Sequence, residues 1–403
     1  MRTIELVEYE PVPAELAPTE LQQILTTDLV AVSPLPAAGA YELRAGSVVG
    51  TVVLRDVWLL IRPKVGLANL FFLLGFGAGI TRWAPERFLY QSEPHLLDAA
   101  AWVFGAAVAQ ALKHGVAKGY QGREAALATL RGRLDVGRQA RARQSRPYPL
   151  DCRFEEFTED VALNRVLKAA HDRLLAQPCL DAAVAHRLRA SRRAFSSVAS
   201  VDYGPGAVPD LRFTRLDHHW EEAYRLARLI LQQQSLRDRT GAALGSAFTV
   251  DVGRLFEQFV ERVFREQAQR AGWHLEAQAR RYLAAGLRIQ PDIVLRRDGQ
   301  DVAVADAKYK DPGDASSAAG AYQDDLYQLL AYCVALGLPA GLLIYAAPRP
   351  LVAHSVQRGR VRLEAVGVDL QAPPELIRRQ VRAAAAHLIE QAGQTLYRRS
   401  LAG

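Results

Sequence analysis

The chain has 403 residues, half of them hydrophobic, so it is long enough for roughly two or three domains with sizeable cores. Its formal net charge of +7 is compatible with nucleic acid as a partner, although the excess of 50 basic over 43 acidic residues is modest. Three widely spaced cysteines argue against a disulfide framework, and no apolar run reaches the ~18 residues of a membrane span, so we expect a cytoplasmic protein with no leader peptide and no membrane partner.

Residues 1–92 form the first predicted segment, a β-rich N-terminal domain. Val48–Leu54 and Val57–Ile61 are apolar runs separated by two charged residues, a pattern typical of a hairpin. The stretch Ile-Arg-Pro-Lys-Val-Gly at 61–66 ends the second run, and residues 67–74 turn helical.

Residues 93–245 form the second predicted segment, a mainly helical middle region. Apolar side chains recur with helical period at 97–112, 160–175 and 219–234. Proline-containing stretches separate these runs, so we expect several helices rather than one long one.

Arginines gather in two parts of the middle region, with few acids nearby. The clusters are Arg123, Arg131, Arg133, Arg138, Arg141, Arg143 and Arg146, and then Arg187, Arg189, Arg192 and Arg193. Such clusters can bind the phosphates of nucleic acid, or they can be solvated surface. Arg131 and Arg133 are our candidates for DNA contacts in this region.

Residues 246–403 are predicted to form an α/β domain whose elements follow the order helix, three strands, helix, strand. The expected elements are a helix at 252–267, strands at 273–279, 289–295 and 301–309, a helix at 321–336, a strand at 341–347 and a closing helix near 374–391. The first helix is amphipathic, and Glu257 lies beside its apolar stripe.

Two short motifs on the second and third of these strands carry the chemistry. They are P-D, ending at Asp292, and D-x-K, from Asp306 to Lys308. Side chains alternate along a strand, so Asp306 and Lys308 must project from one face. We predict a three-residue loop with Gly299 in the left-handed region, because a two- or four-residue loop without a compensating bulge would turn Asp292 to the other face.

Two carboxylates and an ammonium group on one face suit a divalent metal and a phosphodiester substrate. Asp292, Asp306 and the Ala307 carbonyl are the predicted ligands, with Glu257 as a further candidate. Hard oxygen ligands favour Mg²⁺, for which Mn²⁺ can substitute. Lys308 would orient or deprotonate the attacking water and balance charge. The alternative is an ordinary hairpin with surface Asp and Lys, since each motif is common by chance.

The flanking helices supply further candidate residues. Glu257 can reach the metal or its water, or it can be a solvated helix carboxylate. Gln328 and Tyr332 lie one turn apart on the second helix, where Gln328 is a catalytic candidate. Tyr332 and Lys310 are candidates for DNA contacts. A surface glutamine and a core tyrosine are the alternative for the helical pair.

The chain resembles the McrC family, the nuclease subunits of McrBC modification-dependent restriction systems, over most of its length. The stretches that carry the resemblance are 61–66, Leu130–Leu134, Cys152–Asp160 with Asn164, Leu255–Glu257, Pro291–Ile293 and Asp306–Lys310. The order of helices and strands around the last three is similar to the PD-(D/E)xK nuclease core. The resemblance therefore implies an α/β nuclease domain after an α+β N-terminal part.

The resemblance also implies a complex of two different proteins. McrC proteins partner a separate AAA+ GTPase, McrB, which recognises DNA containing methylcytosine. The N-terminal part of McrC engages the GTPase ring and stimulates hydrolysis, while the C-terminal part cuts double-stranded DNA. Residues 1–245 would then dock the ring, with Arg62 and Lys64 as candidates; a strand-end charged pair is their alternative. No glycine-rich phosphate loop occurs, so this chain itself should bind no nucleotide.

Three hypotheses stay open. The first is an Mg²⁺-dependent endodeoxyribonuclease that works as the subunit of a GTP-driven complex and dimerises through its nuclease domain. The second is a stand-alone nuclease of the same fold, which cutting without any GTPase would favour. The third is a non-catalytic regulator of a ring NTPase. The intact Asp292, Asp306 and Lys308 argue against the third.

Overall fold

The computed structural model describes residues 2–78, 95–142, 148–204, 206–232, 244–310, 320–348, 352–355 and 361–402. The chain is a mixed α/β protein that divides into two compact units. Unit 1 combines Met1–Gly50 and Asp56–Tyr90 with Thr249–Gly403, whereas unit 2 consists of Thr51–Arg55 and Gln91–Phe248. Most of the first predicted segment, 1–92, thus lies in the same unit as most of the third, 246–403. The division of the chain into three domains stays a prediction.

The N-terminal part of unit 1 is rich in strands, as its sequence predicts. One sheet has the order β1-β6-β5-β10, with β1 parallel to β6. A second sheet has the order β2-β4-β3. The bounds are β1 Arg2–Val7, β2 Pro11–Glu15, α1 Pro18–Leu25, β3 Val30–Pro34, β4 Ala40–Ala45, β5 Val48–Leu54, β6 Val57–Arg62, α2 Leu67–Ala78 and β10 Leu244–Asp251.

Unit 2 holds the helices expected of the middle region. They are α3 Leu96–Leu112, α5 Ala162–Leu175, α6 Ala182–Arg192 and α7 Glu221–Gln232, with short 3-10 turns at Arg193–Phe195 and His218–Trp220. The apolar faces of α3, α5 and α7 are buried. This burial explains why apolar residues recur with helical period in these parts of the sequence. Asp181 begins α6 by accepting hydrogen bonds from the backbone N–H groups of Ala183 and Val184.

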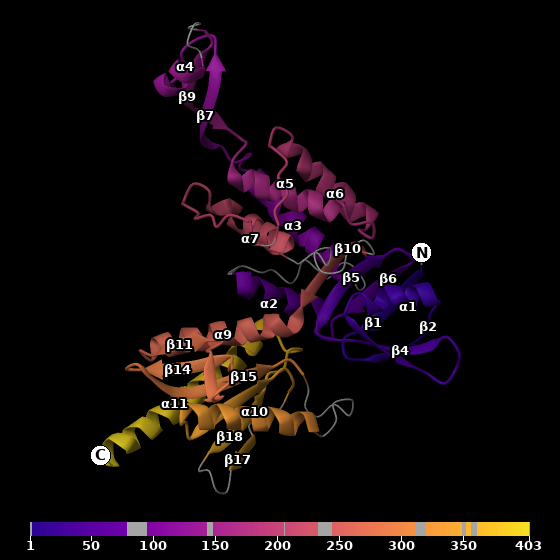
Figure 1. The fold of residues 1–403 in the computed structure, drawn as a ribbon, viewed down its shortest axis with the longest axis vertical. Coiled ribbons are helices and arrows are strands. Elements are labelled where there is room, and N and C mark those ends of the chain that lie inside the picture. Colours follow the sequence, from indigo (N-terminus) through magenta and orange to yellow (C-terminus); the bar gives the residue numbers. More distant parts are fainter. Residues whose placement is uncertain are drawn as a thin grey trace. The chain divides into compact units, whose positions relative to one another are not determined.

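Unit 2 also contains a sheet that the sequence did not predict. Its strands are β7 Gly119–Leu127, β9 Leu150–Thr158 and β8 Arg133–Leu134, followed by α4 Val136–Ala142, and β7 and β9 form a long antiparallel ribbon (Figure 1). No residue of β7 is buried, so the strand lacks the apolar alternation by which a half-buried strand is recognised.

The C-terminal part of unit 1 is built on a six-stranded mixed sheet of order β11-β14-β15-β16-β18-β17, in which β15, β16 and β18 are parallel. The bounds are α9 Val252–Arg270, β11 His274–Ala277, β12 Arg281–Ala284, β13 Leu287–Ile289, β14 Ile293–Arg297, β15 Gln300–Lys308, α10 Gly320–Leu336, β16 Ala340–Tyr345, β17 Val352–Ser355, β18 Arg362–Gly367 and α11 Pro374–Ala402. The predicted order of helix, three strands, helix and strand is present, with the β12–β13 hairpin inserted between β11 and β14. Figure 1 labels α9, β11, β14, β15 and α10 of this series.

Helices cover this sheet and bury β15 on both faces. Val294 and Val304 pack with Leu329 and Tyr332 of α10 in one apolar cluster. Alternate residues of β15 are alanines, and they project from the opposite face. α9 and α11 pack against each other and also contact β15. The D-x-K motif therefore lies on a central strand with helices packed on both faces, and the P-D motif directly precedes the neighbouring strand β14.

The loop of the β14–β15 hairpin differs from the prediction. Arg297 pairs with Gln300, so the loop is the two residues Asp298 and Gly299, with φ angles of 51° and 79°. Positive φ at both positions is typical of a type I′ turn, for which Asp-Gly is a preferred sequence. The predicted three-residue loop is wrong, because the turn preference of Asp-Gly decides its length.

A β-bulge compensates for the even loop. The register shifts between Leu295, which pairs with Ala303, and Arg296, which pairs with Asp301. Val302 is left as the extra residue of β15, and such an insertion exchanges the two faces of all the positions that follow. Asp292 and Asp306 consequently come to one face despite the even loop.

Candidate active site

Asp292 and Asp306 meet at the end of the hairpin opposite its turn. The backbone N–H of Asp292 lies 3.4 Å from Asp306 Oδ1, and the backbone N–H of Ala307 donates to Asp292 Oδ2 at 2.9 Å. Asp306 is 2% exposed, whereas Asp292 is partly exposed. Two aspartates from adjacent strands are thus fixed side by side by the main chain.

Lys308 links the aspartate pair to α10. Its Nζ lies 2.5 Å from Asp306 Oδ2 and donates to Gln328 Oε1 at 2.9 Å. Asp306 and Lys308 project from the same face, as the strand period predicts, and Gln328 approaches them from the covering helix. The structure therefore brings together four of the predicted site residues: Asp292, Asp306, Lys308 and Gln328.

Glu257 lines a cleft near this group, whereas Tyr332 is buried in the core. Glu257 lines the same cleft as Asp292, and burial together with the charge of Asp306 raises the pKa of Glu257. Tyr332 is 4% exposed, its hydroxyl lies 3.5 Å from the Gln290 carbonyl, and burial raises its pKa. This core position does not favour the DNA contact predicted for Tyr332.

The carboxylates of the site are in a setting that a nearby cation would stabilise. Burial, followed by the charge of Asp306, raises the pKa of Asp292 to about 7. Burial lowers the pKa of Lys308, but the charge of Asp306 and its contact with the ammonium group, together with the charges of Asp292 and Asp325, outweigh burial, and the net shift is upward. Buried carboxylates that repel each other are disfavoured as anions until positive charge reaches them.

The donor set fits a metal that needs few carboxylates. In the part of the chain that the structure describes, no three His, Cys, Asp or Glu side chains are grouped to hold an ion. Two aspartates are present, and Asp306 Oδ2 is buried without a hydrogen bond among the described residues, despite its ion pair with Lys308. Mg²⁺ takes one or two carboxylates and keeps several waters, so Asp292, Asp306 and the Ala307 carbonyl suit it.

A cleft of about 580 Å³ opens beside the pair. Its wall includes residues of the C-terminal part of unit 1, among them Asp251, Glu257, Gln278 and Asp292, and also Tyr9 and Ser47 of the N-terminal part. Gln278 donates to Asp292 Oδ1 at 2.6 Å. The sequence could not identify Gln278, Tyr9 or Ser47, because only the fold brings them to the motif.

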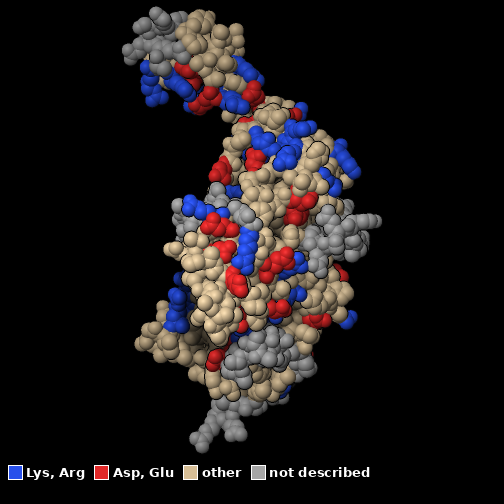
Figure 2. Space-filling view, turned by 90° about the vertical axis from the view of Figure 1, so that its right-hand side faces the viewer, with Lys and Arg blue, Asp and Glu red and all other residues tan. Residues whose placement is uncertain are grey.

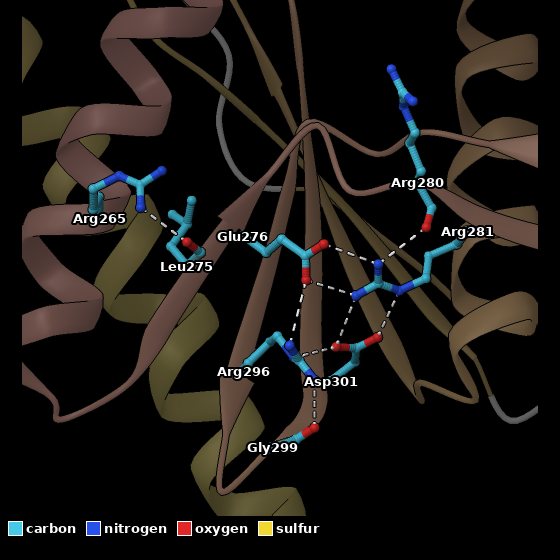
Figure 3. Close-up of polar contacts among 8 residues, drawn as sticks. All are labelled: Arg265, Leu275, Glu276, Arg280, Arg281, Arg296, Gly299 and Asp301. Carbon is cyan, nitrogen blue, oxygen red and sulfur yellow. Dashed lines mark hydrogen bonds and ion pairs between the residues drawn. The ribbon is translucent and has the colours of Figure 1, made fainter.

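An ion-pair network holds the other end of the hairpin (Figure 3). Arg281 of β12 donates to both oxygens of Glu276 at 3.0 and 2.9 Å, and its Nε lies 3.2 Å from Asp301 Oδ2. Arg296 Nε lies 3.0 Å from Asp301 Oδ1, and Arg296 also donates to the Gly299 carbonyl at 2.6 Å. Arg296 and Asp301 are the pair next to the bulge, so the network fixes the register on which the aspartate pair depends.

Three further residues were predicted to contact DNA or the partner: Lys310 and Arg62 form ion pairs, and the main chain of Lys64 accepts a hydrogen bond. Lys310 Nζ lies 2.8 Å from Asp325 Oδ2, and Asp325 also accepts from Tyr345 at 2.7 Å. Arg62 pairs with Glu5 at 2.9 Å. The Lys64 carbonyl accepts from Gln371 of the C-terminal part of unit 1 at 2.7 Å.

The two arginines predicted to bind DNA lie on the β7–β8–β9 sheet. Arg131 pairs with Glu156 at 3.5 Å and stacks on the Phe154 ring at 4.2 Å, while Arg133 pairs in register with Arg153. Figure 2 shows Lys and Arg interspersed with Asp and Glu on the face it presents, as such ion pairs require. DNA contact by Arg131 and Arg133 stays a prediction.

The comparison with family models identifies one family. The sequence matches the family described as "McrBC 5-methylcytosine restriction system component" over residues 43–346. No curated protein matches the chain. No helix among the described residues is long and apolar enough to cross a membrane.

Two solved structures from Thermococcus gammatolerans are similar to the chain. A chain of the refined half-complex from the tetradecameric assembly of McrB AAA+ hexamers with bound McrC aligns with a TM-score of 0.64 at 18% identity, covering 95% of this chain and 100% of its own length. A chain of the McrBC complex aligns with a TM-score of 0.45 at 20% identity, over 66% and 88% of the two chains. At 18% identity the first similarity concerns the fold, whereas the family match spans well over half of the sequence, so the chain belongs to the McrBC 5-methylcytosine restriction system component family.

Proposed function

We propose that this chain is the Mg²⁺-dependent endodeoxyribonuclease subunit of a GTP-driven restriction complex, with a PD-(D/E)xK core. One observation carries the proposal: Asp292 and Asp306 lie side by side on the hairpin while Lys308 contacts Asp306 and Gln328. This is the set of groups that phosphodiester hydrolysis needs, namely two hard ligands and a cation beside them.

Each side chain has a role in this proposal. Asp292, Asp306 and the Ala307 carbonyl would hold Mg²⁺ or Mn²⁺, which when bound would polarise the phosphoryl oxygen and acidify water. Lys308 places positive charge where the attacking water and the phosphate would meet, and Gln328 fixes the direction of its ammonium group. Glu257, which lines the same cleft as Asp292, would accept a hydrogen bond from that water.

The partner and the substrate follow from family membership. McrC is bound to McrB AAA+ hexamers in the fold relative, so we propose an AAA+ GTPase ring as the partner of this chain and double-stranded DNA containing methylcytosine as its substrate. Residues 1–245 would dock the ring, with Arg62 and Lys64 among the contacts. Dimerisation of nuclease domains would supply the second cut.

The test is cleavage of methylated plasmid DNA by the full chain together with its AAA+ partner, GTP and Mg²⁺. Asp306→Asn and Lys308→Ala should abolish cleavage but leave binding to the partner intact. Asp298→Asn is the matched control, since Asp298 is a 92% exposed aspartate on the same hairpin. Cleavage by both site variants would overturn the proposal, and cleavage by the wild-type chain without any GTPase would make it a stand-alone nuclease.

A further inference from the structure

Glu8, which directly follows β1, is a buried carboxylate that the proposed chemistry does not use. It is 1% exposed, and burial raises its pKa to about 6. One oxygen, Oε1, accepts from the Tyr309 hydroxyl at 2.5 Å and from the backbone N–H of Lys64 at 3.0 Å. Among the described residues the other oxygen, Oε2, has no hydrogen-bond partner. Burying a carboxylate in this way is unfavourable, so its place beside Tyr309 needs an explanation.

Tyr9 follows Glu8 and has an unusual backbone. Its φ angle is +60°, which is uncommon for a bulky side chain. Two contacts hold this conformation: its N–H donates to the Ala45 carbonyl at 2.9 Å, and its carbonyl accepts from Arg44 Nε at 3.1 Å. Backbone strain that neighbours maintain is frequent at functional sites. Here it directs the Tyr9 hydroxyl to the Tyr309 carbonyl, 3.3 Å away.

Both contacts reach the same point in the C-terminal part of unit 1. Tyr309 comes directly after Lys308, where β15 ends and the sheet no longer holds the chain. Glu8 binds its side chain and Tyr9 its carbonyl, while the Lys308 carbonyl accepts from the Ala346 N–H at 3.0 Å. Tyr9 also lines the cleft that contains Asp292.

We propose that Glu8 and Tyr9 are positioning residues for the nuclease site, which hold the chain after Lys308 through Tyr309. This inference rests on the proposed function. The site is then composite, because two residues of the N-terminal part fix the end of the strand that carries Asp306 and Lys308. A movement of β1 would be transmitted to Lys308 over one peptide unit.

The first measurement does not need activity. Hydrogen exchange of the purified full chain should speed up at residues 305–310 in Glu8→Gln and Tyr309→Phe, since each removes the charge or the hydroxyl of one contact and keeps the side-chain shape. Glu10→Gln and Tyr282→Phe are the matched controls, because Glu10 is exposed and Tyr282 is 67% exposed in the same unit. Unchanged exchange in both test variants would overturn the proposal.

The second measurement separates positioning from binding. In single-turnover cleavage with the AAA+ partner, Glu8→Gln, Tyr9→Phe and Tyr309→Phe should lower the rate about tenfold and leave DNA affinity unchanged, because small misplacements of a reacting group act on rate. The double variant of Glu8 and Tyr309 should be no slower than either single variant, since both changes remove one contact. If these variants cleave at the wild-type rate while Asp306→Asn is inactive, the positioning role is refuted and the proposed function stands. If Asp306→Asn is active, both the proposed function and the positioning role are refuted.

Discussion

Asp301 offers a direct test of what holds the β14–β15 hairpin in register. Its carboxylate is 18% exposed and contacts two guanidinium groups, at 3.2 Å from Arg281 Nε and 3.0 Å from Arg296 Nε. Exposed ion pairs contribute up to about 1 kcal/mol each, and removing one partner of a buried pair costs several. For two partly buried pairs we expect Asp301→Asn to lower the free energy of unfolding by about 2 kcal/mol.

Urea denaturation is the appropriate assay, because guanidinium chloride would screen the ion pairs that the experiment measures. Asp298→Asn is the matched control: the residue is 92% exposed, and Asn is also favoured in a type I′ turn. If Asp301→Asn changes stability by less than about 0.5 kcal/mol, as an ordinary surface substitution does, the network does not fix the hairpin.

The bulge itself can be tested by deleting Val302. The deletion makes Arg296–Asp301 and Leu295–Ala303 successive pairs, so the ladder continues without a bulge and Asp292 stays opposite Asp306. Nuclease activity should therefore survive the deletion. A deletion variant that folds but no longer cleaves DNA would show that the bulge does more than accommodate the extra residue.

Three further predictions concern stability. His171 is buried and its pKa is lowered to about 4, chiefly by burial, so at acidic pH the unfolded chain binds a proton that the folded chain does not. As pH falls from 6.5 to 4, wild type should therefore lose about 3 kcal/mol more stability than His171→Gln, which urea titrations at each pH measure. Gly341→Ala should cost about 1–3 kcal/mol, since a Cβ there would lie 2.8 Å from Cys333 Sγ and from Leu329, and thermal unfolding measures it. Gly132 has a φ angle of +70° and no room for a Cβ beside Arg153, so Gly132→Ala should expose the β7–β9 ribbon to proteolysis, whereas equal resistance would contradict this.

Local sequence signals gave part of the site correctly. The helical period predicted α9 and α10, and the strand period placed Asp306 and Lys308 on one face, because both features depend only on neighbouring residues. The length of the turn also has a local cause in Asp298-Gly299, but the position of the bulge does not. It depends on contacts between strands, and no single-strand pattern specifies it.

The features that the sequence did not reveal all depend on long-range contacts. Gln278 reaches Asp292 through the pairing of β11 with β14, and Glu8 reaches Tyr309 across 301 positions of sequence. The β7–β9 ribbon was missed for a different reason: no residue of β7 is buried, so this strand has no apolar face to generate a pattern. The cleft therefore depends on residues that are distant in sequence and that only the folded chain brings to the motif.

The aspartate pair should lower the stability of the metal-free protein. Asp292 is a partly buried carboxylate beside Asp306 and near Glu257, and like charges in such a setting repel. Asp292→Asn keeps a side-chain oxygen for the Ala307 N–H and removes the repulsion, so at pH 8 with chelator it should raise the free energy of unfolding by about 1 kcal/mol while abolishing cleavage. Mn²⁺ at about tenfold its Kd should stabilise wild type by about 1.4 kcal/mol and the variant far less, because only the native pair binds it. A variant less stable than wild type without metal, together with no effect of Mn²⁺ on wild type, would mean that the two carboxylates are a structural pair and not a metal site.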